Sequence, residues 1–282
     1  MARKKKGIPH YAGSTVILAS KITIYFLKGL YAMLSGVGSA VMFTTKKVQE
    51  KKEKTAIKEK KIKRPKTKAK FAGIKEIKSL KGKAKTFENF VLSSESAIGI
   101  ILGARGTGKS AIGLKLLENL HAKTEKPVYA IGFNAKDMPS WINIVDKTEE
   151  IENDSVVLID ESGISFSSRK SMSNANQVLS SLLMIARHKN LSVLFITQNS
   201  SNLEVNVLRQ ADFLVMKPSS LMQKDFERKK IKEIYEAVDK DFEEFKGLKG
   251  ITYIHSDKYK GFITNELPSF WSTKVSKAFK EK

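Results

Sequence analysis

Apolar and polar positions divide the chain into three stretches of different character. Residues 22–43 are almost entirely apolar, residues 46–85 alternate lysines with small polar residues, and from residue 96 onward short apolar runs alternate with helical patterns. Apolar runs that alternate with helices predict an α/β fold with a mostly parallel, doubly wound sheet. The expected strands lie within 97–102, 128–133, 155–161, 191–200 and 213–216, and the expected helices are 111–120 and 174–189.

The first apolar stretch has the length of a membrane span. It reads ITIYFLKGLYAMLSGVGSAVMF, carries the single charge Lys28, and as a helix would cover roughly 33 Å against about 30 Å of hydrocarbon. We therefore expect a basic segment at 1–21, a transmembrane helix at 22–44, a polybasic linker at 45–87 and a globular domain at 88–282. An amphipathic helix on a membrane or partner surface is the alternative. A signal peptide fits less well, because no small-residue cleavage site follows.

Charge follows the same division. Residues 1–87 hold 24 basic and 4 acidic residues, net +20, whereas residues 88–282 hold 27 basic and 25 acidic residues, net +2. Lysines beside a membrane helix can bind anionic headgroups or nucleic-acid phosphates, and a simple spacer is the alternative. Because lysines follow the apolar stretch directly, the globular domain is expected on the cytoplasmic side of a membrane. The globular domain itself is expected to be nearly neutral.

Several kinds of chemistry are excluded by composition. The chain has no cysteine, so it contains no disulfide, thiolate metal site or cysteine nucleophile. The four histidines show no i, i+4 spacing, which makes a histidine metal site an unfavourable interpretation. They are His10, His121, His188 and His255.

The segment GARGTGKS, residues 103–110, stands between an expected strand and an expected helix. This context turns the pattern G-x-x-x-x-G-K-S into a phosphate-binding loop, the Walker A motif of a P-loop NTPase. Its glycines allow backbone N–H groups to surround a phosphate, Lys109 would contact the β- and γ-phosphates, and Ser110 would hold Mg²⁺. The expected nucleotide-binding residues are Gly103, Gly106, Thr107, Gly108, Lys109 and Ser110. ATP and Mg²⁺ are the expected ligands.

Polar side chains end two further expected strands. SVVLIDE, residues 155–161, places Asp160 as the Walker B carboxylate facing Mg²⁺, and Glu161 as the carboxylate that polarises the attacking water. This second carboxylate favours hydrolysis over transfer to a metabolite. LSVLFITQNS, residues 191–200, places Gln198 where it can reach the γ-phosphate if this strand lies beside the loop strand.

Together these motifs resemble the additional-strand P-loop ATPases of the FtsK/HerA group, which have a RecA-like fold. The likeness is carried by GARGTGKS, VVLIDE, IARHKN leading into SVLFITQ, and NVLRQADFLVMK, over about residues 95–220. Zonula occludens toxin-like and viral packaging members look most similar. The resemblance implies a sensor strand between the Walker A and Walker B strands. It also implies a homo-oligomer, a ring or an array, that moves DNA or drives assembly at membranes.

An arginine from a neighbouring subunit is a further implication of the resemblance. Arg187 and Arg209 are the two candidates for this trans finger. The serine-rich loop 162–176, with Arg169, is the candidate contact for a translocated strand.

The C-terminal region is less informative about function. In residues 223–249 the apolar positions Phe226, Ile231, Ile234, Tyr235 and Val238 recur at helical spacing and are expected to be buried. ITYIHSDKYKGFIT alternates like a hairpin, and Phe270 and Trp271 are expected to pack as a plug.

Three functions are consistent with the sequence. The first is a membrane-anchored ATPase that moves DNA, as in viral genome packaging, conjugation or segregation. The second is a toxin-like ATPase of virion assembly or export that acts on a coat or portal-like protein. The third is a membrane-tethered nucleic-acid-binding switch that is not a motor.

Overall fold

The structure, a computed structural model, describes residues 64–161 and 171–276, with the backbone alone for residues 171–175. The expected basic segment 1–21, the expected membrane helix 22–44 and Arg169 of the serine-rich loop lie outside the described residues. Within those residues, none of the helices combines the length and the apolar character needed to cross a bilayer.

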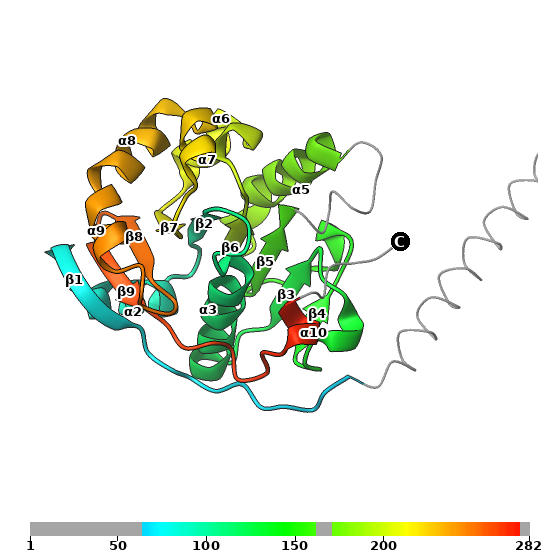
Figure 1. Cartoon of the computed structure of the whole chain (residues 1–282). Coiled ribbons are helices and arrows are strands. Elements are labelled where there is room, and N and C mark those ends of the chain that lie inside the picture. The colour runs from blue at the N-terminus through cyan, green and yellow to red at the C-terminus, as the bar shows by residue number, and fades with distance from the viewer. Residues whose placement is uncertain (1–63, 162–170, 277–282) are drawn as a thin grey trace, which may run out of the picture. The chain divides into compact units, whose positions relative to one another are not determined.

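A single nine-stranded sheet organises the described residues (Figure 1). Its order is β1-β9-β8-β7-β2-β6-β5-β3-β4, and all pairs from β7 to β4 are parallel, whereas β7–β8, β8–β9 and β1–β9 are antiparallel. The strands are β1 (Lys75–Gly82), β2 (Ile98–Leu102), β3 (Val128–Ile131), β4 (Ile142–Ile144), β5 (Val156–Asp160), β6 (Ser192–Ile196), β7 (Phe213–Met216), β8 (Thr252–Ser256) and β9 (Tyr259–Thr264). The five predicted strands are confirmed. The strand β6 lies between β2 and β5, as the resemblance implies.

Helices cover both faces of this sheet, which confirms the doubly wound architecture. Successive residues of β2 point to opposite faces: Ile100 and Leu102 join one core cluster, and Ile101 joins the other. The first cluster is closed by α5 (Ser171–Ala186), α6 (Val205–Gln210), α8 (Lys229–Ala237) and α9 (Asp239–Glu244), and the second by α2 (Ala84–Ser93), α3 (Lys109–Thr124) and α10 (Thr273–Ser276). Short elements complete the fold: α7 (Leu221–Phe226), η1 (Ala135–Asp137), η2 (Thr148–Glu150) and η3 (Ser200–Asn202).

The expected linker 45–87 is wrong for residues 64–87. Arg64 donates to the carbonyl oxygens of Met138, Pro139 and Ile142, residues 75–82 form the edge strand β1, and α2 begins at Ala84. An edge strand needs only backbone hydrogen bonds from one neighbour, here β9, so its side chains can be mostly exposed, and three of the eight are lysines. These residues carry nine basic side chains and one acidic one, so residues 64–282 have a net charge of +10 instead of the nearly neutral domain expected.

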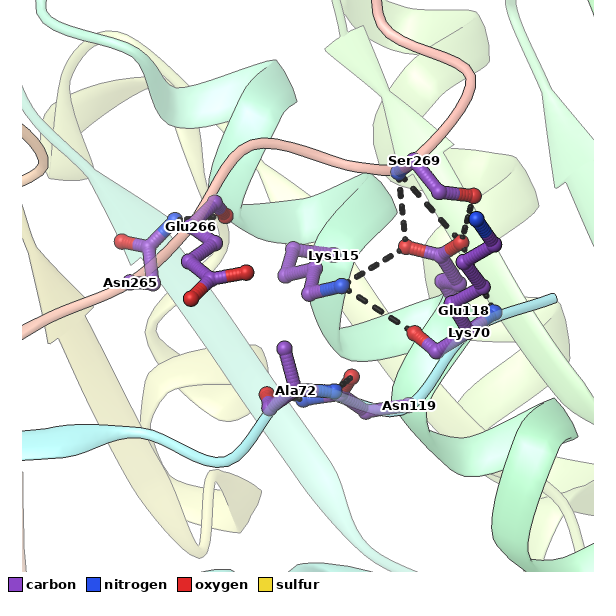
Figure 2. Close-up of polar contacts among 8 residues, drawn as sticks. All are labelled: Lys70, Ala72, Lys115, Glu118, Asn119, Asn265, Glu266 and Ser269. Carbon is purple, nitrogen blue, oxygen red and sulfur yellow. Dashed lines mark hydrogen bonds and ion pairs between the residues drawn. The ribbon is translucent and has the colours of Figure 1, made fainter.

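Two segments far apart in sequence lie side by side on α3, and we call them the N-terminal strap (residues 66–74) and the C-terminal strap (residues 265–271) (Figure 2). Glu118 of α3, fully buried, accepts hydrogen bonds from the backbone N–H groups of Lys70 (3.0 Å) and Ser269 (3.1 Å). Its other partner is Lys115, whose Nζ lies 2.9 Å from Oε2 and also donates to the carbonyl of Lys70. Asn119 bonds both backbone groups of Ala72. The straps are therefore part of the folded body.

The C-terminal region agrees with the sequence in most respects. The hairpin is confirmed as β8 and β9, and residues 223–249 form helices whose Ile231, Tyr235 and Val238 are buried. Phe226 is 67% exposed, so its expected burial is wrong, because α7 ends there and the helical spacing does not continue into α8. Phe270 packs edge-on against Trp141, as expected for a plug.

Candidate functional site

The loop between β2 and α3 has the backbone shape of a phosphate cradle. Gly103 and Gly108 have φ values of 144° and 94°, which side chains other than glycine rarely adopt. A Cβ atom at Gly103 would also lie 2.5 Å from Cβ of Lys217. The α3 helix begins directly after Gly108, so its N-terminal N–H groups face the loop. The predicted strand, loop and helix are all confirmed.

Lys109 is the first residue of α3 and lies over the loop. Its side-chain ammonium donates to the carbonyl oxygens of Gly103 (2.8 Å) and Ala104 (2.9 Å), and the residue is only 8% exposed. Burial lowers the pKa of Lys109, although the carboxylates of Asp160 and Glu161 act in the opposite direction. The ammonium and these two carboxylates therefore belong to one electrostatic site.

Ser110 and Asp160, the two residues predicted to hold Mg²⁺, are hydrogen-bonded to each other. The Ser110 hydroxyl donates to Oδ2 of Asp160 over 3.0 Å, and Asp160 is 2% exposed at the end of β5. The described residues contain no group of three or more His, Asp or Glu side chains that could hold a metal ion. One hydroxyl and one carboxylate fit Mg²⁺ when most of its ligands are water and phosphate oxygens, which is the usual arrangement at nucleotide sites.

Glu161 follows Asp160 and is held by two side chains that sequence reasoning missed. The hydroxyl of Thr197 donates to Oε2, and Nδ2 of Asn202 donates to Oε1 over 3.0 Å. Thr197 directly follows β6 and Asn202 lies in η3, so the segment after the strand next to β5 positions the carboxylate. Thr197 was visible in the sequence only as one of several polar residues at a strand end. Asn202 carried no signal, because its contact depends on the turn geometry of η3.

Gln198 lies at the same edge of the sheet as the loop, because it follows β6 and β6 pairs with β2. Its side chain is exposed, and its backbone carbonyl accepts a hydrogen bond from Nε2 of Gln223. The position agrees with a sensor of the γ-phosphate. That role itself stays a prediction.

The structure does not bring Arg187 or Arg209 to this site. Arg187 follows α5, just before the turn in which Leu191 N–H donates to the carbonyl of Ala186. Arg209 lies in the last turn of α6, close to Asp212, which bonds the first residue of β2. Both arginines are exposed near the amino ends of the strands, whereas the loop is at the carboxyl ends. A role at the site of a neighbouring subunit stays a prediction.

A buried cation was also missed. Lys217, the residue after β7, is 2% exposed and contacts Gly103 of the loop. Its only signal in the sequence was a charged residue directly after the apolar run FLVM.

Comparison with known proteins gives a family and a set of related folds. The family described as Zonular occludens toxin (Zot) matches residues 97–244. No curated protein matches the sequence. Among solved structures, the DNA-packaging ATPase B204 from Sulfolobus Turreted Icosahedral Virus is 17% identical, with 62% of this chain and 100% of that chain covered and a TM-score of 0.41.

Two other solved structures are similar in fold. The N-terminal domain of zonular occludens toxin from Neisseria meningitidis is 15% identical, with 66% of this chain and 99% of that chain covered and a TM-score of 0.32. The pCW3 conjugation coupling protein TcpA is 13% identical, with 63% of this chain and 62% of that chain covered and a TM-score of 0.42. These similarities concern the fold alone.

Proposed function

The chain belongs to the Zonular occludens toxin (Zot) family and is a P-loop ATPase, and we propose that it hydrolyses ATP to move DNA at a membrane. The observation that supports hydrolysis is the pair of hydrogen bonds that hold the Glu161 carboxylate next to Asp160, which itself bonds Ser110. A carboxylate held in this way can accept a proton from water, which is the general-base role that hydrolysis requires.

Each residue of the site has a separate role in the proposed hydrolysis. Lys109 and the N–H groups at the start of α3 bind the phosphates. Their positive charge stabilises the negative charge that develops on the γ-phosphate in the transition state. Ser110 and Asp160 would hold Mg²⁺, which supplies neutralisation of phosphate charge when it is bound. Glu161 orients the attacking water and takes its proton, and Gln198 is placed to contact the γ-phosphate. The neighbouring subunit would supply Arg187 or Arg209.

The proposal that DNA is the substrate is supported by the sequence resemblance and by the charge of the folded body. Hydrolysis by the full chain should rise when double-stranded DNA is added, and Glu161→Gln should abolish hydrolysis while ATP still binds. A mass measurement with ATP and Glu161→Gln would give the size of the oligomer. Hydrolysis that DNA never stimulates, with no DNA binding at modest salt, would overturn the DNA part of the proposal.

Action on a protein is the second candidate, and one surface favours it. The helix α7 exposes three large apolar side chains, Leu221 (80%), Met222 (72%) and Phe226 (67%). Gln223 of the same helix donates to the carbonyl of Gln198 at the end of β6. An exposed apolar group of this kind is typical of a protein contact. Hydrolysis that responds to a coat or portal-like protein and ignores DNA would favour this candidate.

Attachment to a membrane and the cytoplasmic placement of the ATPase domain are proposed from the apolar stretch 22–44 and its flanking lysines. Fractionation should recover the full chain with membranes that carbonate washing does not strip. Deletion of residues 22–44 should release it. If the third, non-motor function held, Lys109→Ala and Glu161→Gln would leave biological activity unchanged.

A further inference from the structure

Lys217 extends the pairing between β7 and β2 into the phosphate loop. Its backbone N–H donates to the carbonyl of Leu102 over 2.8 Å, and the carbonyl of Pro218 accepts from the N–H of Ala104 over 3.0 Å. The hydroxyl of Tyr235 on α8 donates to the carbonyl of Lys217. Three hydrogen bonds therefore fix the backbone of Lys217 and Pro218, directly behind the phosphate loop.

The side chain of Lys217 passes behind the loop toward β8. Its Nζ atom donates to the carbonyl oxygens of Gly250 (3.0 Å) and Ile251 (3.2 Å). A Cβ atom at Gly108 would lie 4.0 Å from Nζ, and Gly108 directly precedes the first residue of α3. The ammonium therefore lies against the back of the loop, on the side opposite to solvent.

The burial of this charge is unusual within the described part of the chain. Lys115 is equally buried, but it forms an ion pair with Glu118 at 2.9 Å. No carboxylate among the described residues forms an ion pair with Lys217. Burying an ammonium with only carbonyl partners lowers stability, since the carbonyls do not replace its hydration fully. A charge kept at such a position needs a compensating anion, and the phosphates of the nucleotide are the anions this loop is shaped to bind.

We propose that Lys217 is a positioning residue that supplies positive charge to the phosphate loop from behind, so that nucleotide affinity increases with the number of phosphates. This inference rests on the nucleotide site proposed above and extends it by one residue. Lys109 reaches the phosphates from the front of the loop, whereas Lys217 acts through the loop backbone and touches no substrate atom. The polyphosphate in turn neutralises a charge that has no ion-pair partner among the described residues.

The same arrangement predicts a pH dependence. Burial lowers the pKa of Lys217 to about 7, so its charge is present below that pH and is lost above it. Two titratable groups lie next to it: Tyr235 on α8 donates to its carbonyl, and Lys109 donates to the carbonyl of Gly103, the glycine that Lys217 contacts. The buried Glu227, next to α7, acts on Tyr235. Burial raises the pKa of Tyr235, which stays neutral, and burial lowers the pKa of Lys109. The contribution of Lys217 to ATP affinity should therefore be larger at pH 6 than at pH 8.5.

The test compares nucleotide affinities of the full chain with those of Lys217→Met and Lys217→Gln. Methionine fills the space without charge, and glutamine removes the charge but keeps an N–H donor for the carbonyls. Fluorescent analogues of ATP, ADP and AMP are titrated at several pH values, and thermal unfolding is recorded for each variant. Lys258→Met, in the exposed turn between β8 and β9, is the control for the loss of one positive charge elsewhere.

Both Lys217 variants should bind ATP about tenfold more weakly at pH 6, ADP less so, and AMP as the parent does. Their midpoint of thermal unfolding should be equal to or above that of the parent, because a buried lone charge has been removed. The ionisation of ATP itself cancels in the ratio between variant and parent. Lys258→Met should change none of these values.

Two results would overturn the inference. Parental ATP affinity in Lys217→Gln would show that the hydrogen bonds matter and the charge does not. An equal loss for ATP, ADP and AMP, with a lower unfolding midpoint, would show a purely structural role. A parent that binds ATP without hydrolysing it would refute the proposed ATPase motor, and the affinities would still decide the role of Lys217.

Discussion

Replacement of Glu118 by alanine should reveal how much of the stability of this domain depends on the two straps. The Glu118 carboxylate is fully buried and accepts from the backbone N–H groups of Lys70 and Ser269, one from each strap. It also pairs with the ammonium of Lys115, itself 3% exposed (Figure 2). Glu118→Ala removes all of these contacts at once and leaves the Lys115 ammonium buried without an anion.

The expected loss follows from this burial. Removing one partner of a buried ion pair lowers the free energy of unfolding by about 3–5 kcal/mol, because the remaining charge stays desolvated. A matched control exists on α8, where Lys230 and Glu233 have the same i, i+3 spacing at 3.3 Å but are 81% and 46% exposed. Glu233→Ala should cost about 0–1 kcal/mol. The difference between the losses in free energy of unfolding of the two variants measures the effect of burial, because residue type and spacing are the same.

Urea unfolding followed by circular dichroism and by tryptophan fluorescence provides the assay. The chain has two tryptophans, and Trp271 lies two residues after Ser269. Fluorescence therefore reports on the C-terminal strap, and dichroism reports on the whole domain. Lys115→Met introduced into Glu118→Ala should recover much of the lost stability, because no unpaired charge is left.

A loss no larger for Glu118→Ala than for Glu233→Ala would refute the reasoning, as would a double variant less stable than Glu118→Ala. A pH series adds a second check. Burial raises the pKa of Glu118, but hydrogen bonds from Lys115, Ser269 and Lys70 outweigh it and the pKa is lowered overall. The stabilisation is therefore full above the unfolded pKa of about 4.3 and is lost as the pH falls below it. In Glu118→Gln the free energy of unfolding should depend less on pH in this acid range, because glutamine does not titrate.

The remaining predictions concern the nucleotide site. Gly103→Ala should lower the unfolding midpoint more than Gly106→Ala, because both have positive φ but only Gly103 has a neighbour, the Lys217 side chain, within 4 Å of the added methyl group; equal midpoints would contradict this. Thr197→Val should lower kcat about ten- to hundredfold with little change in KM, since it frees the Glu161 carboxylate, and Thr197→Ser should restore the rate. Mixing Arg209→Ala with Lys109→Ala subunits should restore hydrolysis if Arg209 acts in a neighbouring site; inactive mixtures would favour Arg187.

The nucleotide site was predictable because its signals are local. An apolar strand that ends in a carboxylate, and a glycine loop between strand and helix, fix the position of Asp160 and Lys109 without knowledge of the rest of the fold. Parallel strands then bring their carboxyl ends to one edge, so residues from β2, β5 and β6 meet. The placement of β6 between β2 and β5 came from the resemblance, since periodicity alone does not order strands.

Contacts that depend on distant segments were not predictable in this way. The strand β1 has almost only exposed residues, three of its eight residues are lysines, and it is held by backbone bonds to β9, so no hydrophobic alternation marks it. Lys115 and Glu118 have charged side chains that normally face solvent, and they are buried only because two straps cross α3. The hydrogen bond from Asn202 to Glu161 likewise depends on a short turn after β6.

The basic side chains of residues 64–87 differ in whether they are available to bind DNA phosphates. Arg64 donates to three backbone carbonyl oxygens, and Lys75, Lys78 and Lys85 form ion pairs with Glu266, Asp241 and Glu88. These cations stabilise the fold, and a phosphate would have to compete with their present partners. Five other lysines of this segment are exposed and form no ion pair with a described carboxylate: Lys66, Lys68, Lys70, Lys81 and Lys83. A DNA phosphate that contacted these exposed lysines would not have to break an existing ion pair. If the folded body binds DNA, we therefore expect these positions to contribute more than its net charge as a whole.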